Sequence, residues 1–235
     1  MIITIDGPSG SGKSTVAHAI AKKNGWYYLN SGFLYRAVAW QCMRDNLSRE
    51  QVAHLDSERI ERYTDPKIFT YEYRDGIVRV LINGQDITGE LKTPIMDIYA
   101  SQVSKIVLVR ERLLDIQKLY AQNYTIVAEG RDMGTVVFPE AQFKFFITAT
   151  LTERARRWQI LQKKAGIVVS HEQAEKDLSV RDAHDTQRTN SPLKAANDAH
   201  VIDTTNLTVN QVIDRVMEYI RAYTKILGSS STRPE

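Results

Sequence analysis

The sequence has very little cysteine and no long apolar run, and each absence excludes a class of protein. Cys42 is the single cysteine, so a disulfide framework is impossible and a reducing compartment suits the chain. We expect Cys42 to be a small core residue rather than a nucleophile. No apolar run approaches the roughly 20 residues that a membrane-spanning helix needs. The five histidines show no metal-ligand spacing, so the sequence predicts no zinc site.

The size and charge of the chain suit a single enzyme domain. Its 235 residues, 43% of them hydrophobic and 25% charged, fit one α/β domain with an insertion, or at most two small domains. The formal net charge of +3 suits the binding of several phosphates but is too small to indicate a nucleic-acid partner. The N-terminus leads directly into a predicted strand, so we expect no signal peptide and a soluble, cytoplasmic protein. We expect one domain over residues 1–227 and a flexible, Ser-rich tail over residues 228–235.

The functional interpretation depends on a stretch near the N-terminus. Residues 2–5 are β-branched and predict a buried strand, residues 7–14 match G-x-x-x-x-G-K-[S/T], and a helical segment follows over residues 15–23. The glycines let backbone N–H groups turn toward a phosphate, and the helix N-terminus faces the same anion. In this pattern Lys13 contacts the β- and γ-phosphates, and the Ser14 hydroxyl can bind Mg²⁺. A Gly- and Ser-rich surface turn is the alternative, but the strand–loop–helix context argues against it. The predicted ATP-binding residues are Gly7, Pro8, Ser9, Gly10, Ser11, Gly12, Lys13, Ser14 and Thr15.

A small antiparallel lobe interrupts an otherwise alternating strand–helix chain. Residues 68–73, 77–82 and 85–87 alternate between apolar and polar side chains. Asp75-Gly76 and Asn83-Gly84 separate these runs, and both dipeptides are strong hairpin signals. We therefore expect an α/β P-loop fold in three layers with a central parallel sheet. A small β lobe is inserted over about residues 46–108, and a helical lid covers about residues 153–170.

A charged loop follows the predicted strand over residues 124–128. Glu129, Arg131 and Asp132 lie within four residues, and such a cluster is costly to place in a core. Loops after the carboxyl ends of parallel strands line the ligand crevice, so we favour a functional loop over a plain surface turn. An acid at this place could hold Mg²⁺ through a water, which makes Glu129 a candidate metal residue.

Two helical segments add further arginines. The first begins at Thr152 and carries Arg154, Arg156 and Arg157, and a mobile lid that brings cations to the γ-phosphate is a sensible use of them. Solvated helix arginines are the alternative. The second segment alternates basic and acidic residues over 181–188, and by itself it looks like a charged, exposed helix end.

The remaining arginines indicate a second anion site. They come from separated segments of the chain and are Arg36, Arg110, Arg131, Arg181 and Arg188. A hydrolase or GTPase needs only the first phosphate site, whereas a kinase needs a second one for its acceptor. The guanine-reading pattern N-K-x-D is missing from the sequence. Phosphoryl transfer to a small anionic acceptor is therefore the predicted reaction class.

Four motifs together resemble the bacterial cytidylate kinases, which are P-loop nucleoside monophosphate kinases. They are the P-loop run 5–14, Ser-Gly-Phe-Leu-Tyr-Arg over 31–36, Glu-Gly-Arg-Asp-Met-Gly-Thr-Val-Val-Phe-Pro over 129–139, and residues 181–188 with 191–193. The resemblance spans residue 2 to about 222. The run over 130–139 is very specific, whereas the P-loop alone is generic.

The resemblance implies transfer of the ATP γ-phosphate to CMP or dCMP with Mg²⁺. By position, it implies that Ser31, Arg36 and Arg131 contact the acceptor nucleotide and its phosphate. Ser101, Arg110 and Asp132 would read the cytosine edge. Arg181, Asp185 and Arg188 would hold the sugar and phosphate, which revises the interpretation of the 181–188 segment. The implied catalytic residues are Lys13, Arg131, Asp132, Arg154 and Arg157.

Three positions depart from the family pattern. Asn30 and Glu129 stand where Asp is common, and Trp158 interrupts the usual arginine pair of the lid. A P-loop kinase with another acceptor, such as UMP, AMP or a small metabolite, is the nearest alternative. A nucleotide-dependent regulator or RNA-binding module is a second, but the scattered basic residues and the missing aromatic stacking motif disfavour it. We expect a monomer that acts on ATP and CMP or dCMP, without a nucleic-acid or membrane partner.

Overall fold

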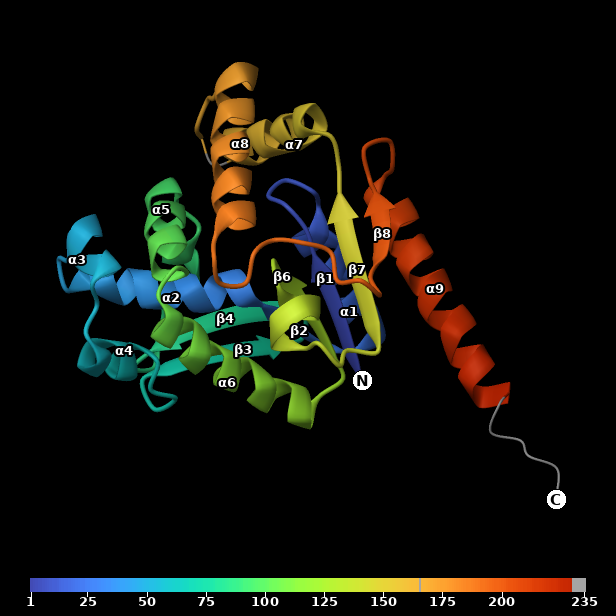
Figure 1. The fold of residues 1–235 in the computed structure, drawn as a ribbon, viewed down its shortest axis with the longest axis horizontal. Coiled ribbons are helices and arrows are strands. Elements are labelled where there is room, and N and C mark those ends of the chain that lie inside the picture. Colours follow the sequence, from blue (N-terminus) through green and yellow to red (C-terminus); the bar gives the residue numbers. More distant parts are fainter. Residues whose placement is uncertain (165, 230–235) are drawn as a thin grey trace.

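A parallel sheet forms the centre of the protein, whose computed structural model describes residues 1–164 and 166–229 (Figure 1). The strand order in this sheet is β2-β6-β1-β7-β8, and every pairing is parallel. The strands are β1 (Ile2–Asp6), β2 (Tyr27–Asn30), β6 (Ile126–Gly130), β7 (Phe143–Thr148) and β8 (His200–Asp203). In the register, Ile5 of β1 lies opposite Glu129 of β6 and Phe145 of β7. The carboxyl ends of β1 and β6 therefore lie side by side.

Helices cover both faces of the sheet, as a buried parallel sheet requires. On one face, α1 (Lys13–Asn24) and α9 (Val209–Ser229) form a core that includes Val127 of β6. On the other face, α2 (Ser31–Arg44) and α6 (Val107–Asn123) form a core that includes Ile126 and Ala128. Successive residues of a strand point to opposite faces, so this alternation gives three layers. The predicted three-layer fold with a central parallel sheet is confirmed.

The predicted antiparallel lobe lies between α2 and α6. Its strands are β3 (Phe69–Arg74), β4 (Ile77–Ile82) and β5 (Gln85–Asp86), paired in that order. Both turn dipeptides, Asp75-Gly76 and Asn83-Gly84, have positive φ at each residue, as a two-residue hairpin turn requires. The other elements of this region are α3 (Arg49–Ala53), α4 (Ser57–Tyr63), a 3₁₀ helix (Thr88–Leu91) and α5 (Pro94–Val103).

Tyr71 of β3 attaches this lobe to the central sheet. Its hydroxyl donates to the carbonyl oxygen of Tyr28 at 3.0 Å and accepts from the backbone N–H of Asn30 at 3.1 Å. Tyr71 is almost completely buried and belongs to the same core as α2 and β2. The lobe is therefore packed on the sheet rather than tethered to it.

Two helices lie beyond the carboxyl ends of β1 and β7 (Figure 1). They are α7 (Leu151–Lys164) and α8 (His171–Gln187), and a π-helical turn (Met133–Val137) follows β6. α7 and α8 share a small core of Ala155, Ala174 and Leu178 that is separate from the two main cores. The helix pair can therefore be held together independently of the sheet.

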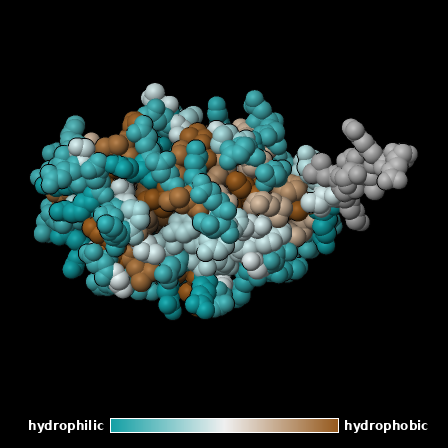
Figure 2. Space-filling view, turned by 90° about the horizontal axis from the view of Figure 1, so that it is seen from below, coloured by the Kyte–Doolittle hydropathy of each residue, from teal (hydrophilic) through white to brown (hydrophobic). Residues whose placement is uncertain are grey.

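The last helix is longer than its sequence pattern predicts. The amphipathic pattern predicts residues 209–223, whereas α9 continues to Ser229 and so includes the first residues of the predicted tail. The rest of that tail, residues 230–235, lies outside the described residues. Among the described helices, none is both long and apolar enough to cross a bilayer. In Figure 2, apolar residues are interspersed with hydrophilic ones over the face shown.

Candidate active site

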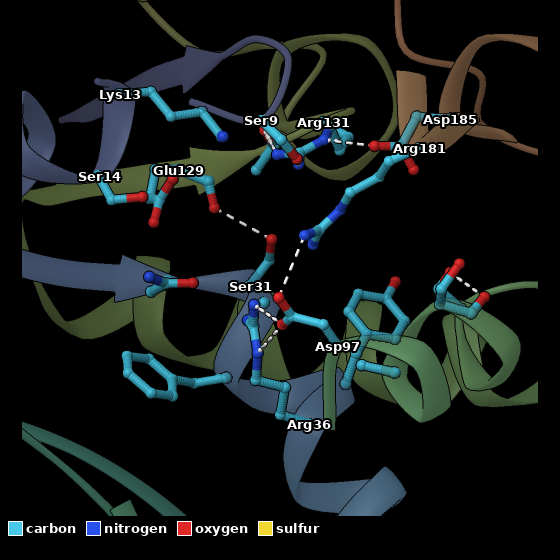
Figure 3. Close-up of a pocket in the computed structure, with 18 of the residues that line it drawn as sticks. Ser9, Lys13, Ser14, Ser31, Arg36, Asp97, Glu129, Arg131, Arg181 and Asp185 are labelled. Atoms are coloured by element: carbon cyan, nitrogen blue, oxygen red, sulfur yellow. Dashed lines mark hydrogen bonds and ion pairs between the residues drawn. The ribbon is translucent and has the colours of Figure 1, made fainter. Parts of the chain in front are cut away.

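A cavity of about 430 Å³ opens beyond the carboxyl ends of β1, β2 and β6 (Figure 3). Its walls come from the P-loop, α2, α5, α6, α7, α8 and the segment after β6. The predicted site residues that line it are Ser9, Gly10, Lys13, Ser14, Ser31, Arg36, Ser101, Arg110, Glu129, Arg131, Asp132, Arg181, Asp185 and Arg188. Five other predicted residues, Gly7, Pro8, Ser11, Gly12 and Thr15, belong to the P-loop and the start of α1 but do not line the cavity.

The P-loop backbone needs glycine where it turns most sharply. Gly10 has a φ of +76°, and a Cβ there would lie 2.9 Å from the carbonyl oxygen of Arg154. Gly12 has a φ of +92° and caps α1, so the helix begins at Lys13. The N-terminus of α1 therefore faces the cavity with its free N–H groups, which is a favourable place for phosphate.

Lys13 lies inside this loop and is only 7% exposed. Its Nζ donates to the carbonyl oxygen of Pro8 at 3.2 Å. Burial, with a smaller contribution from the charge of Arg131, lowers the pKa of the Lys13 ammonium to about 7. An anion placed beside Nζ would oppose both effects, so the site favours an incoming phosphate.

Asp6, the last residue of β1, holds the segment after β6 against the P-loop strand. Its carboxylate accepts the backbone N–H groups of Met133 at 2.9 Å and Gly134 at 2.8 Å. Burial raises the pKa of Asp6 to about 7. Gly134 is needed because a Cβ would lie 2.8 Å from the Thr4 hydroxyl oxygen. No role for Asp6 is predicted from the sequence, although its place directly before Gly7, at the end of a predicted strand, is a usable signal.

Arg131 connects the P-loop to α8. Its Nε donates to the Asp185 carboxylate at 2.7 Å, and its Nη2 donates to the Ser9 hydroxyl at 2.7 Å. Burial raises the pKa of Asp185, but the charge and hydrogen bond of Arg131, together with the charges of Arg181 and Arg188, outweigh it, and the pKa lies below its usual value. Arg131 therefore stands between the phosphate loop and the remaining arginines of the cavity.

Asp132 holds a second pair of arginines. It forms a buried ion pair with Arg110 of α6, and Arg188 lies 3.9 Å away on its other side. Arg110 also donates to the carbonyl oxygen of Ser104 at 3.2 Å. The Nη2 of Arg188 is buried and has no hydrogen-bond partner within the part of the chain that is described. This wall thus offers one partly unused cation.

A third carboxylate, Asp97 in the first turn of α5, is missing from the sequence-based site. It pairs with Arg36 of α2 at 2.6 Å and with Arg181 of α8 at 3.2 Å (Figure 3). The Thr93 side chain caps α5 and Pro94 begins it, which orients this first turn. The only local signal was the Thr-Pro helix start, and it says nothing about arginines in α2 and α8.

The predicted lid arginines lie on the outer side of the P-loop. Arg154 is 7% exposed, donates to the carbonyl oxygen of Ser9 at 3.1 Å and pairs with Asp182 at 2.6 Å. Arg157 donates to the carbonyl oxygens of Ser11 at 3.1 Å and Thr204 at 2.6 Å. Neither side chain lines the cavity, whereas Trp158, Leu161 and Gln162 of α7 do.

Two oxygen ligands suitable for Mg²⁺ line the cavity near Lys13. They are the Ser14 hydroxyl and the Glu129 carboxylate. Glu129 is 2% exposed, and the Tyr28 hydroxyl donates to its Oε1 at 3.0 Å. Among the described residues, no group of three or more His, Cys, Asp or Glu side chains could hold a metal ion by itself. These donors fit a Mg²⁺ that is shared with substrate phosphates and waters.

Comparisons with known proteins identify the family of the chain. A family model described as cytidylate kinase matches residues 3–222. A protein named cytidylate kinase from Caldanaerobacter subterraneus subsp. tengcongensis is 42% identical over 223 residues, which is 95% of this chain and 96% of that protein. One of the same name from Thermotoga neapolitana is 43% identical over 218 residues, covering 93% and 96%. A solved structure of an uncharacterized protein from Eubacterium ventriosum is similar to this chain, with a TM-score of 0.52 and 15% sequence identity. The similarity covers 94% of this chain and 98% of the other chain, so the two proteins share the fold.

Proposed function

Because the chain belongs to the cytidylate kinase family, we propose that it transfers the γ-phosphate of ATP to CMP or dCMP in pyrimidine nucleotide metabolism. The products are ADP and CDP or dCDP. The observation that carries this proposal is the shared cavity, in which the P-loop lysine and five arginines from separated segments surround one space. A donor phosphate at the P-loop and an acceptor phosphate among the arginines would meet there.

Under this proposal, ATP binds at the P-loop and the acceptor binds between α2, α5, α6 and α8. Lys13 neutralises the β- and γ-phosphates, and Arg131, beside Ser9, lies between donor and acceptor. The predicted contacts with the acceptor phosphate and sugar come from Ser31, Arg36, Arg131, Arg181, Asp185 and Arg188. The predicted contacts with the cytosine edge come from Ser101, Arg110 and Asp132. The Nη2 of Arg188 has only a long 3.9 Å ion pair with Asp132 and no hydrogen bond among the described residues, which supports an anion at this wall.

Catalysis of this transfer needs no strong general base. An oxygen of the acceptor phosphate is already anionic at neutral pH, so the protein has only to position and screen two phosphate groups that repel each other. Ser14, and Glu129 through a water, would hold Mg²⁺. A Mg²⁺ ion bound there would neutralise part of the charge on the ATP phosphates.

We further propose one catalytic domain over residues 1–227, with the inserted lobe over about 46–108 and the lid over about 153–170. The separate small core of α7 and α8 supports a helix pair that moves as a unit. Closure would bring Arg154 and Arg157 toward the phosphates and exclude water, so that ATP is not hydrolysed. A cytoplasmic monomer without nucleic-acid or membrane partners completes the proposal, and the single buried cysteine suits a reducing compartment.

A coupled assay of ADP release tests the reaction. ATP and Mg²⁺ are supplied with CMP, dCMP, UMP, AMP or GMP, and we expect fast turnover with CMP and dCMP and slow turnover with the others. Fast turnover with another nucleotide would contradict the cytosine-reading roles. ADP release without any dependence on an acceptor would contradict the kinase itself.

Arg188→Met tests the acceptor wall. We expect the KM for CMP to rise roughly tenfold or more, because a charge that would contact the acceptor is lost, while the KM for ATP changes little. Arg112→Met is the matched control, since Arg112 is an exposed arginine of α6 that pairs with Glu61. Equal losses for CMP and ATP would argue against a separate acceptor site.

A further inference from the structure

Asp97 lies between two arginines that come from opposite walls of the cavity (Figure 3). The Nε and Nη2 of Arg36 both donate to Oδ1, at 3.0 and 2.6 Å. The Nη1 of Arg181 donates to Oδ2 at 3.2 Å. One carboxylate thus bridges α2 and α8, and both of its oxygens are used.

This bridge occupies the part of Arg36 that is best suited to a phosphate. Nε and Nη2 form the edge of a guanidinium that binds two oxygens of a carboxylate or phosphate. The other end of the guanidinium lies against the start of α2, because a Cβ on Gly32 would be 2.6 Å from Nη1. An incoming anion that uses the Nε–Nη2 edge must therefore take the place of Asp97.

The charges around Asp97 also favour replacement of its carboxylate by an incoming phosphate. Arg36 and Arg181 are both cationic, and in the absence of an anion between them they repel each other. Burial raises the pKa of Asp97, but the charges and hydrogen bonds of Arg36 and Arg181 together outweigh it, and the pKa lies below its usual value. The carboxylate is therefore ionised at neutral pH, and a phosphate placed beside it would be repelled unless the carboxylate withdrew.

We propose that Asp97 is an internal counter-anion that occupies the acceptor-phosphate position in the substrate-free protein and is displaced from both arginines by the entering phosphate. The identity of that acceptor rests on the proposed function. Asp97 is then a positioning residue: it keeps two mutually repelling arginines in place and makes anion binding compete with an internal ion pair. Inorganic phosphate must displace Asp97 from the two arginines and gains only phosphate contacts in return. A nucleotide gains base and sugar contacts as well. Competition from Asp97 therefore favours binding of a complete nucleoside monophosphate over inorganic phosphate.

Asp97→Asn tests the displacement, because it keeps the shape of the side chain and removes its charge. Calorimetry measures the Kd values of CMP, inorganic phosphate and cytidine for the wild-type protein and the variant. We expect CMP and inorganic phosphate to bind about tenfold more tightly to the variant, as when a binding-competent state populated about one time in ten becomes dominant. We expect the Kd of cytidine to be unchanged, since cytidine carries no phosphate to displace Asp97.

Two further variants make the result specific. Asp115→Asn removes the same charge from an exposed position on α6 and should leave all three Kd values unchanged. Asp97→Ala should tighten CMP and inorganic phosphate in the same direction as Asp97→Asn. A purely structural role for Asp97 predicts weaker binding in both Asp97 variants, and unchanged or weaker binding of inorganic phosphate would overturn the proposal.

The outcomes for Asp97 and for the proposed function are separable. If the wild-type protein phosphorylates a monophosphate other than CMP, the proposed substrate is wrong. Inorganic phosphate still reports on the exchange in that case, because it carries no base. If CMP is the substrate but the Asp97 variants bind inorganic phosphate no more tightly, the function stands and the counter-anion is wrong.

Discussion

The buried state of Lys13 makes ATP binding depend on pH in a defined direction. Without ligand, burial lowers the pKa of Lys13 from its ordinary 10.5 to about 7. Bound phosphate favours the charged ammonium and returns the pKa toward 10.5. Below about pH 7 the ammonium is already present and no proton is taken up. Above that value each binding event must also protonate Lys13, so affinity falls as the pH rises.

The magnitude follows from the separation of the two pKa values. The affinity for ATP should fall about tenfold per pH unit well above the lower pKa. Because Lys13 is about half protonated at pH 7, the loss between pH 7 and pH 9 is roughly 50-fold, or about 2.3 kcal/mol. Calorimetry with ATP and Mg²⁺, without acceptor, gives the Kd over this range. Repetition in buffers of different ionisation enthalpy gives the proton uptake, which should approach one per ATP at the alkaline end.

Lys13→Arg is the matched control, because arginine stays charged throughout this range. Its affinity for ATP can be lower, but the part of the pH dependence that belongs to Lys13 should disappear. Any slope that it keeps is assigned to Asp6, whose pKa is raised to about 7 by burial and whose deprotonation adds negative charge behind the loop. A wild-type Kd that is constant from pH 7 to pH 9, with no proton uptake, would refute the reasoning.

The remaining predictions concern stability. Tyr71→Phe removes a buried hydroxyl that hydrogen-bonds to the backbone of Tyr28 and Asn30. The free energy of unfolding, measured in urea, should therefore fall by about 1–3 kcal/mol. An unchanged unfolding midpoint would mean that this link between the lobe and the sheet does not stabilise the protein. Gly134→Ala places a Cβ 2.8 Å from the Thr4 hydroxyl oxygen, and the melting temperature should fall by an amount that corresponds to roughly 1–3 kcal/mol. A variant as stable as the wild type would show that the turn after β6 can shift to accommodate the added methyl group at little cost in stability.

Much of the fold could be predicted from the sequence because its signals are local. The glycines of the P-loop occupy positions with φ of +76° and +92° at Gly10 and Gly12, where other residues are strained. The Asp-Gly and Asn-Gly turns of the lobe have positive φ at both residues, as their sequences predict. The strands and most helices follow from apolar periodicity, with ends shifted by a few residues, as at β6 and α9.

The surroundings of Glu129 could not be predicted from the sequence. Its place in a charged cluster predicts a loop outside the core, after a strand over residues 124–128. In the structure β6 continues to Gly130, and Glu129 is 2% exposed. A hydrogen bond from Tyr28, a residue about one hundred positions earlier in the chain, compensates for this burial. Strand order brings β2 beside β6, and no pattern near Glu129 contains that information.

The sequence by itself determined the phosphate loop, the reaction class and the set of arginines, because each depends on residue type and short spacing. Only the tertiary structure decided which charge neutralises which arginine. Arg131 pairs with Asp185, Asp132 with Arg110, and Asp97 with two arginines from α2 and α8. The physical reason is that an ion pair depends on distance in space, and the partners here lie 22 to 84 residues apart in the chain.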